Sequence, residues 1–248
     1  MPPPPPTLPD ELVEEIFLRL LPDEPECLVR ASLASKHWLS LLSSPTFHGR
    51  YCEFHGAPPM LGFVCIRPVR SVPTFVSTTK FGARIPPDDK EADVLDCRHG
   101  RVLLKQMGVK PMTLVVWDPM TGCRRELHAP RDYRDFVHTA AVLCAVAGCD
   151  HRACHDGPFR VVLVALDMNH GDFVAKAYMS CPEVGELSSD LHLVAKWKDP
   201  RYRLDLWTEY VFINPVPPVL IKDKLCFMLW HNDNFDMELL QYDMGSNC

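Results

Sequence analysis

The stretch LPDELVEEIFLRL at residues 8–20 decides how the chain begins to fold. Leu12, Ile16 and Leu20 recur at steps of four, which predicts an amphipathic helix with a broad apolar stripe. Thr7 offers a hydroxyl to cap this helix, and acidic residues follow in its first turn, where the helix dipole favours negative charge. The chain therefore opens with a helix whose apolar stripe must be covered.

Two more helical stretches follow, at about residues 26–34 and 35–42, and Ser44-Pro45 is expected to break the last of them. Each carries apolar residues on one side. Three helices within about forty residues bury only a limited fraction of their surface. They carry more apolar surface than a small bundle can hide, which predicts an interaction surface.

The order of motifs in this region resembles the F-box. The resemblance covers residues 7–51 and is carried by LPDELVEEIFLRL (8–20), by Leu28, Arg30, Ala31 and Leu33, and by SKHWLSLLSSPTF (35–47). It implies a three-helix module that docks on a Skp-family adaptor, which links it to the cullin and RING subunits of a ubiquitin ligase. An ordinary helical subdomain packed on the rest of the chain is the alternative.

The resemblance also implies which residues contact the adaptor. By position they belong to the loop before the first helix, to that helix, and to the packing between the helices. They are Leu8, Pro9, Leu12, Ile16, Leu20, Leu28, Leu33 and Trp38.

From about residue 56 the chain changes to short apolar runs broken by Pro, Gly, Asp and Asn, which is the pattern of an all-β domain. The segment 113–127 predicts a strand, a turn at Asp118–Gly122, and a second strand. Similar turns recur about 60 residues apart, which favours propeller blades of about four strands each. An irregular β-sandwich stays open as the alternative.

The predicted fold class is therefore α+β multidomain, with a three-helix F-box followed by an all-β, propeller-like domain of about three blades. We expect a disordered polyproline tail at 1–6, the F-box at 7–51, a linker with irregular β structure at 52–95, and the propeller-like domain at 96–248. A closed propeller typically takes four to eight blades, so this domain is expected to be incomplete and truncated.

Composition excludes several classes of protein. Lysine and arginine number 26 against 32 aspartate and glutamate, a net charge of -6, which speaks against nucleic-acid binding. The longest apolar stretch, residues 139–148, is about half of what spans a bilayer, and the proline-rich N-terminus is unlike a signal peptide. We therefore expect no membrane partner and a location in the cytoplasm and/or nucleus, with the 11 cysteines reduced.

One cysteine- and histidine-rich stretch follows Cys144. Cys149, His151, Cys154 and His155 are of the residue types that zinc prefers. Their spacing argues against a site, because zinc ligands usually come from two separated segments and adjacent Cys154 and His155 would point apart. A polar loop without metal is the favoured reading, and a small zinc-binding protein centred on residues 144–155 is the alternative.

No phosphate-cradling glycine loop and no nucleophile motif is present, so we expect neither a cofactor nor catalysis. The chain resembles the plant, grass-type F-box proteins that carry a kelch-like propeller after the F-box. The resemblance implies the substrate-recognition subunit of a cullin-RING (SCF-type) ubiquitin ligase, which presents an unidentified target protein through its β domain. An adaptor-binding protein with a non-functional receptor domain is the second possibility within this reading.

Overall fold

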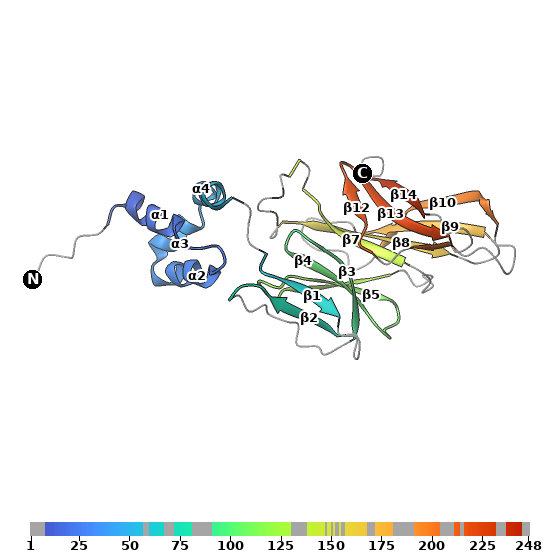
Figure 1. Ribbon diagram of the computed structural model, residues 1–248, viewed down its shortest axis with the longest axis horizontal. Coiled ribbons are helices and arrows are strands. Elements are labelled where there is room, and N and C mark those ends of the chain that lie inside the picture. Colours follow the sequence, from blue (N-terminus) through green and yellow to red (C-terminus); the bar gives the residue numbers. More distant parts are fainter. Residues whose placement is uncertain are drawn as a thin grey trace, which may run out of the picture. The chain divides into compact units, whose positions relative to one another are not determined.

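The computed structural model describes the following residues: 8–56, 60–66, 72–80, 91–129, 138–146, 148–149, 151, 154, 157–167, 172–180, 191–203, 211–213, 216–231 and 237–244. The chain divides into two compact units. The first, the helical unit, holds all the helices of the described residues, and the second, the β unit, holds three larger sheets. Figure 1 shows the helices in blue and these sheets in green to red.

The described residues of the helical unit include four helices, one more than predicted. They are α1 (Asp10–Leu18), α2 (Pro25–Ala34), α3 (Lys36–Leu42) and α4 (Pro45–His55). The prediction that Ser44-Pro45 breaks the third helix is confirmed, since α3 ends at Leu42. The same two residues also start a helix that was not predicted. The Ser44 side chain accepts a hydrogen bond from the Phe47 amide, and Pro45 takes the first helical position, where its missing N–H costs nothing.

The start of α1 also differs from the prediction. Pro9 occupies the capping position without a side-chain hydrogen bond, and the predicted cap, Thr7, lies outside the described residues. At the other end, α1 stops at Leu18, so that Leu20 follows the helix rather than extending its stripe. The acidic first turn is present in Asp10 and Glu11.

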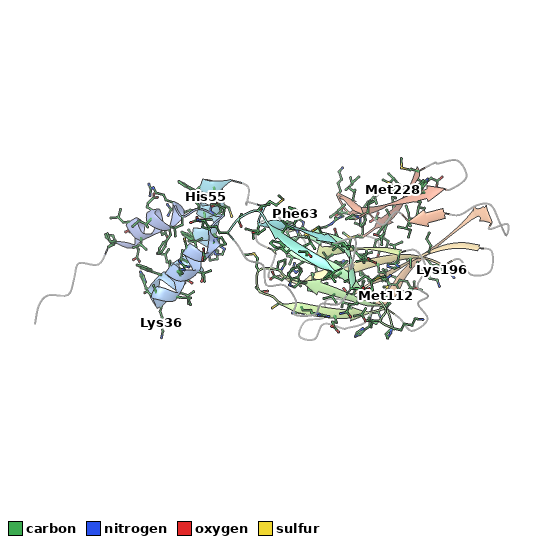
Figure 2. All side chains as sticks on the ribbon, turned by 60° about the horizontal axis from the view of Figure 1, so that its bottom comes forward. Lys36, His55, Phe63, Met112, Lys196 and Met228 are labelled. Carbon is green, nitrogen blue, oxygen red and sulfur yellow. The ribbon has the colours of Figure 1, made fainter. Side chains whose placement is uncertain are left out.

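A small apolar core joins the four helices. Its buried members are Val13, Phe17, Leu18, Leu42 and Phe47. The helices are also tied by polar contacts: the Tyr51 hydroxyl donates to the Leu20 carbonyl oxygen at 2.7 Å, and His55, labelled in Figure 2, lies with Nε2 2.7 Å from the Leu18 carbonyl oxygen. Side chains of α4 thus close the carbonyl end of α1, where backbone oxygens lack partners within the helix.

The β unit consists of antiparallel sheets formed by strands that are neighbours in sequence. The first sheet runs in the order β3 (Ala92–Arg98), β4 (Arg101–Gln106), β5 (Thr113–Trp117) and β6 (Arg124–His128). The second contains β7 (His138–Cys144), β8 (Phe159–Asp167), β9 (Asp172–Met179) and β10 (His192–Arg203). In the third, β13 (Lys224–His231) pairs with β11 (Val211–Ile213), β12 (Val219–Ile221) and β14 (Met237–Asp243). A two-stranded sheet pairs β1 (Gly62–Ile66) with β2 (Pro73–Ser77), and most of its residues are assigned to the helical unit.

The second sheet is covered on both faces. Alternate residues of β8 belong to two cores: Val161 and Leu163 pack with the first sheet, and Val162 and Val164 pack with the third. Met112, labelled in Figure 2, belongs to the first of these cores. A strand buried on both faces reads as a continuous apolar run, which is the pattern that β8 has in the sequence.

The third sheet buries one face and exposes apolar side chains on the other. Leu225, Phe227 and Leu229 point into the core shared with the second sheet. The alternate position Trp230 is 43% exposed, and its partner across the strands, Met237, is also exposed. The exposed face therefore carries apolar residues, which is typical of a face that packs against another layer.

The β-rich region agrees with the sequence prediction at the level of class. Antiparallel sheets follow the helices, and no barrel closes within the described ranges. The predicted strand–turn–strand around Asp118 is confirmed, with Trp117 buried at its start. The β unit's first sheet begins at Ala92, before the predicted boundary at 96. The propeller stays a prediction, although three four-stranded antiparallel sheets are the units from which propellers are built.

Candidate functional site

The helical unit exposes large apolar side chains along α1. Leu12 and Ile16 lie one turn apart on the same face of the helix, and each is 51% exposed. Leu8, just before the helix, is 57% exposed, and its neighbour Pro9 is also exposed. On α2, Leu33 is 81% exposed. We call Leu8, Pro9, Leu12, Ile16 and Leu33 the exposed docking residues, since they are the predicted adaptor contacts whose side chains are free of the unit's own core.

The three other predicted adaptor contacts take part in packing. Leu20, Leu28 and Trp38 are partly buried against the core of the helical unit. Trp38 meets Phe17 edge to face, with ring centroids 5.3 Å apart. These residues therefore hold the helices together, and any contact they make with another protein comes from the part of each side chain that stays accessible.

The exposure of Leu12 and Ile16 follows from how α1 is seated. Val13 and Phe17, one position later in each turn, fill the core, so the neighbouring positions turn outward by about 100°. Two sets of polar contacts link α1 to the other helices: Asp10 Oδ1 lies 2.8 Å from His37 Nε2 on α3, and Arg50 of α4 bonds both Glu14 and Glu15. Because most of these side chains are exposed to solvent, each contact contributes little to stability.

A second set of chemically active side chains lies in the β unit. Cys144, Cys149, His151 and Cys154, the Cys/His cluster, each offer one ligand atom, and these atoms all lie within 4.8 Å of one another. Cys154 is buried and its sulfur is 3.6 Å from His151 Nδ1. Burial, together with the nearby thiols of Cys144 and Cys149, raises the pKa of Cys154 to about 11.

The Cys/His cluster differs by one residue from the four candidates taken from the sequence. It contains Cys149, His151 and Cys154, as considered there, but Cys144 takes the fourth place, and His155 lies outside the described residues. Cys144 is the last residue of β7, whereas the other three belong to the connection toward β8. The cluster thus combines the end of a strand with the loop that follows it, and it does not need the adjacent pair Cys154 and His155 that counted against the sequence-based set.

Charged residues elsewhere in the β unit do not gather into a site among the described residues. Asp93 lies in β3, and Asp88 and Asp89 lie outside the described residues. Arg124 pairs with Glu126 at 2.7 Å, and Arg125 lies over the Phe159 ring at 5.9 Å. These arginines belong to the strand surface rather than to a binding pocket.

One buried acid was not anticipated from the sequence. Asp96 is 2% exposed, its Oδ2 accepts a hydrogen bond from the Val142 amide at 3.0 Å, and it pairs with Arg98. Burial raises the pKa of this carboxyl above its ordinary value of 3.8, against the opposing effect of Arg98. A shift of one residue in the β3–β4 register beside Asp96 marks a β-bulge, a feature that local sequence does not reveal.

The first part of the helical unit is similar to a known protein family. Residues 6–49 match the family model of the F-box domain. The match includes α1 to α3, the start of α4 and all the exposed docking residues. A search among curated proteins finds no match to the chain.

Residues 6–49 are thus an F-box domain, the class of helical module that binds Skp1-type adaptors in SCF ubiquitin ligases. F-box proteins are generally non-catalytic adaptor subunits of these ligases. Among the described residues, no helix is both long and apolar enough to cross a membrane.

Proposed function

We propose that this protein is the substrate-recognition subunit of a cullin-RING (SCF-type) ubiquitin ligase. The exposed docking residues bind a Skp-family adaptor, which connects the chain to the cullin and RING subunits. The β unit presents an unidentified target protein, and the chain itself performs no chemistry. The proposal places the protein in the cytoplasm and/or nucleus, where such ligases would meet their targets.

The observation that carries the proposal is the F-box match together with the exposure of its apolar residues. Among the described residues, the core of the helical unit has five buried apolar side chains, and Leu8, Leu12, Ile16 and Leu33 are about half or more exposed. Burying one such side chain contributes about 1.5–3 kcal/mol of free energy. Because folding leaves these side chains exposed, burying them against an apolar partner surface would contribute this free energy to binding. This supports a protein partner on the α1 side of the unit.

The mechanism that follows is proximity. A target held on the β unit is brought near the conjugating enzyme recruited through the ligase, which raises the effective concentration of its acceptor lysine. No side chain of this chain needs to touch the reacting atoms. The β unit supports this role because the connections between its strands are placed on a scaffold of sheets, where proteins ordinarily carry their binding residues.

We further propose that the three larger sheets are blades of a propeller-type receptor domain, of the kind that plant F-box proteins carry. Each sheet has four strands, and the second packs face to face with both others. This stacking is what successive blades require. An additional blade would pack on the exposed apolar face of the third sheet, and a solved structure of the chain in complex with its target would show whether one does.

The docking claim is tested by co-purification of the full chain with a Skp-type adaptor. Leu8→Ala combined with Pro9→Ala is expected to abolish co-purification, and Leu12→Ala combined with Ile16→Ala is expected to weaken the affinity at least about tenfold, because each variant removes apolar area from the contact. Fluorescence anisotropy with a labelled adaptor gives the affinities. Wild-type binding by both double variants would contradict the docking claim.

Leu239→Ala supplies the matched control, because Leu239 is as exposed as Leu8 but lies on β14 in the β unit. It is expected to bind the adaptor like the wild type. Phe17→Ala serves as the folding control: it removes a buried side chain of the helical core, so it should lose binding together with helical circular dichroism, which the docking variants retain.

The receptor role requires a separate measurement, because a chain with a non-functional β domain would pass the adaptor test. Quantitative proteomics after translation arrest, with and without the protein, should reveal at least one protein that is degraded more slowly when the chain is missing. The same protein should be recovered with the wild type by affinity purification. Adaptor binding with no such protein would favour an F-box protein that occupies the adaptor without delivering a target.

A further inference from the structure

We propose that the Cys/His cluster in the β unit is a structural zinc site, with Cys144, Cys149, His151 and Cys154 as the four ligands. This inference is independent of the proposed role in ubiquitination, because it rests on residues of the β unit alone. A zinc ion there would fasten the connection between β7 and β8 to the end of β7.

The distances within the cluster are close to those of a metal site. Zn–S bonds of about 2.3 Å and Zn–N bonds of about 2.0 Å place the ligand atoms of a tetrahedral site roughly 3.5–3.8 Å apart. The Cys154 sulfur and His151 Nδ1 are already 3.6 Å apart, and no pair among the four ligand atoms exceeds 4.8 Å. Side-chain rotations alone can close the remaining difference, so the backbone is already arranged for the ion.

The donor set selects the metal. Three thiols and one imidazole are soft and borderline ligands, which suit zinc and exclude calcium and magnesium, since those ions require oxygen donors. Four protein ligands also fill a tetrahedral shell and leave no position for water or substrate. The site is therefore structural rather than catalytic.

The backbone around the cluster is held by groups that would support the ligands. The amides of Val146 and His151 donate to the sulfurs of Cys144 and Cys149, each at 3.4 Å. Such N–H···S contacts stabilise thiolate character, as outer hydrogen bonds do in metal sites generally. The loop reaches this arrangement through left-handed backbone at Gly148 and His151, with φ of 66° and 62°.

Two residues at the β3–β4 hairpin contact the same loop. The Arg101 side chain, at the start of β4, is buried and donates to the backbone oxygens of Cys154 and Gly157, at 3.3 and 2.6 Å. The His99 ring, in the turn before β4, lies against the His151 ring, with centroids 4.4 Å apart. These contacts hold the Cys154 backbone and the His151 ring in place, and both belong to the proposed ligand set.

The test is a measurement of metal in the full chain, produced with zinc in the medium and purified under reducing conditions without chelators or a histidine tag. Mass spectrometry of metals should find about one zinc per chain. After removal of zinc, titration with Co²⁺ should produce the d–d absorption of a tetrahedral site and a sulfur-to-cobalt charge-transfer band. An octahedral cobalt spectrum, or zinc far below one per chain even after zinc is added, would overturn the proposal.

Matched variants identify the ligands. Cys154→Ser is expected to lose more than about nine tenths of the zinc, whereas Cys226→Ser, at an equally buried cysteine outside the cluster, should retain it. His151→Ala should likewise lose zinc, whereas His155→Ala should retain it. Equal loss from both members of either pair would overturn the ligand assignment.

A variant that unfolds would lose zinc whether or not the substituted residue is a ligand. A second measurement therefore uses the wild type. Chelation of the wild-type ion should lower the midpoint of thermal unfolding and expose the cluster thiols to alkylation, with Cys144, Cys149 and Cys154 modified before Cys226. A disulfide within the cluster of the freshly purified protein, found by intact mass in place of metal, would instead show that these cysteines form a redox pair and would overturn the zinc site.

Discussion

Asp96 shows how a single buried acid connects two sheets. It lies in β3 of the first sheet, and its carboxylate accepts the amide of Val142 in β7, which is the edge strand of the second. An outward-facing amide on an edge strand has no strand partner, and a buried amide without a partner costs about 1–3 kcal/mol. Asp96 supplies that partner at the cost of burying a charge.

This arrangement predicts a pH dependence. Burial raises the pKa of Asp96 above its ordinary 3.8, so the folded state holds the proton more tightly than the unfolded state does. The contribution of Asp96 to stability is therefore fully present below about pH 4 and is lost as pH rises through the raised pKa. In urea unfolding of wild type and Asp96→Asn across this range, the wild type should lose stability relative to the variant as pH rises.

The comparison uses Asn because it keeps the shape of the side chain but does not titrate. Asp93→Asn, on the same strand, is the control and should show a smaller change with pH, because Asp93 is less buried than Asp96. A difference between wild type and Asp96→Asn that grows in favour of wild type with rising pH would contradict the assignment.

Cys144 lies at the start of the stretch noted in the sequence but was not among the four ligand candidates. Cys149, His151 and Cys154 lie close together in the sequence, so they attract attention as a group. Cys144 ends a strand, and only the connection that brings residues 149–154 back beside that strand places its sulfur with theirs. The signal available in the sequence was the position of Cys144, which ends an apolar run and is separated from Cys149 by four residues.

At the scale of single elements, the apolar stripe of α1 can be predicted from the sequence, but the role of each residue within it cannot. Periodicity places Leu12 and Ile16 on the same apolar face as the core residues. The structure divides that face: Val13 and Phe17 pack, and Leu12 and Ile16 stay outside. Periodicity measures the width of an apolar face and does not say which part of it the chain's own core covers.

The helix α4 depends on its cap, which gives a prediction at this scale. Ser44→Ala removes the acceptor for the Phe47 amide and should cost about 0.5–2 kcal/mol in the stability of α4. Hydrogen exchange of the first-turn amides of α4 in the full chain provides the measurement. Ser40→Ala, at an exposed position within α3, is the matched control and should be neutral or slightly stabilising.

Faster exchange confined to α4 in the Ser44 variant is the expected pattern, since the lost bond belongs to that helix. No change in α4, or an equal change after Ser40→Ala, would mean that packing of Phe47 holds the start of α4 without the cap.

At the scale of the whole molecule, the chain consists of two compact units with separate cores. The second sheet is central to the β unit because both of its faces are buried. Its strands β7 and β8 supply alternate residues to two cores. Damage to this sheet should therefore affect all three larger sheets.

Leu163→Ala tests this expectation. Leu163 is fully buried in β8, and shortening it should destabilise the β unit by about 2–5 kcal/mol through lost contacts and a cavity. Leu193→Ala, at an exposed position of β10, should stay within about 0.5 kcal/mol of the wild type. Hydrogen exchange reports both units at once in the intact chain.

With Leu163→Ala, exchange should accelerate in the first, second and third sheets and stay unchanged in α1 and α4. An equal acceleration in the helices would show that the two units unfold together, and the reading of two separately stable cores would then be wrong.

The class of each region, and the resemblance of the first region to the F-box, could be predicted from the sequence alone. The motif order of residues 8–47, the turn at Asp118 and the apolar runs of the β region are local signals, and helix periodicity, turn chemistry and alternation act over a few residues. For that reason three of the four described helices, the strand–turn–strand at 113–127 and the F-box could be predicted without a structure.

Only the tertiary structure decided which apolar residues are covered and which distant groups meet. The division of α1 between core and exposed docking residues, the pairing of Asp96 with Val142, and the meeting of Cys144 with His151 all depend on contacts between elements. Such contacts are set by how faces pack and by where a connection returns, and neither is encoded within the few residues that a sequence pattern spans.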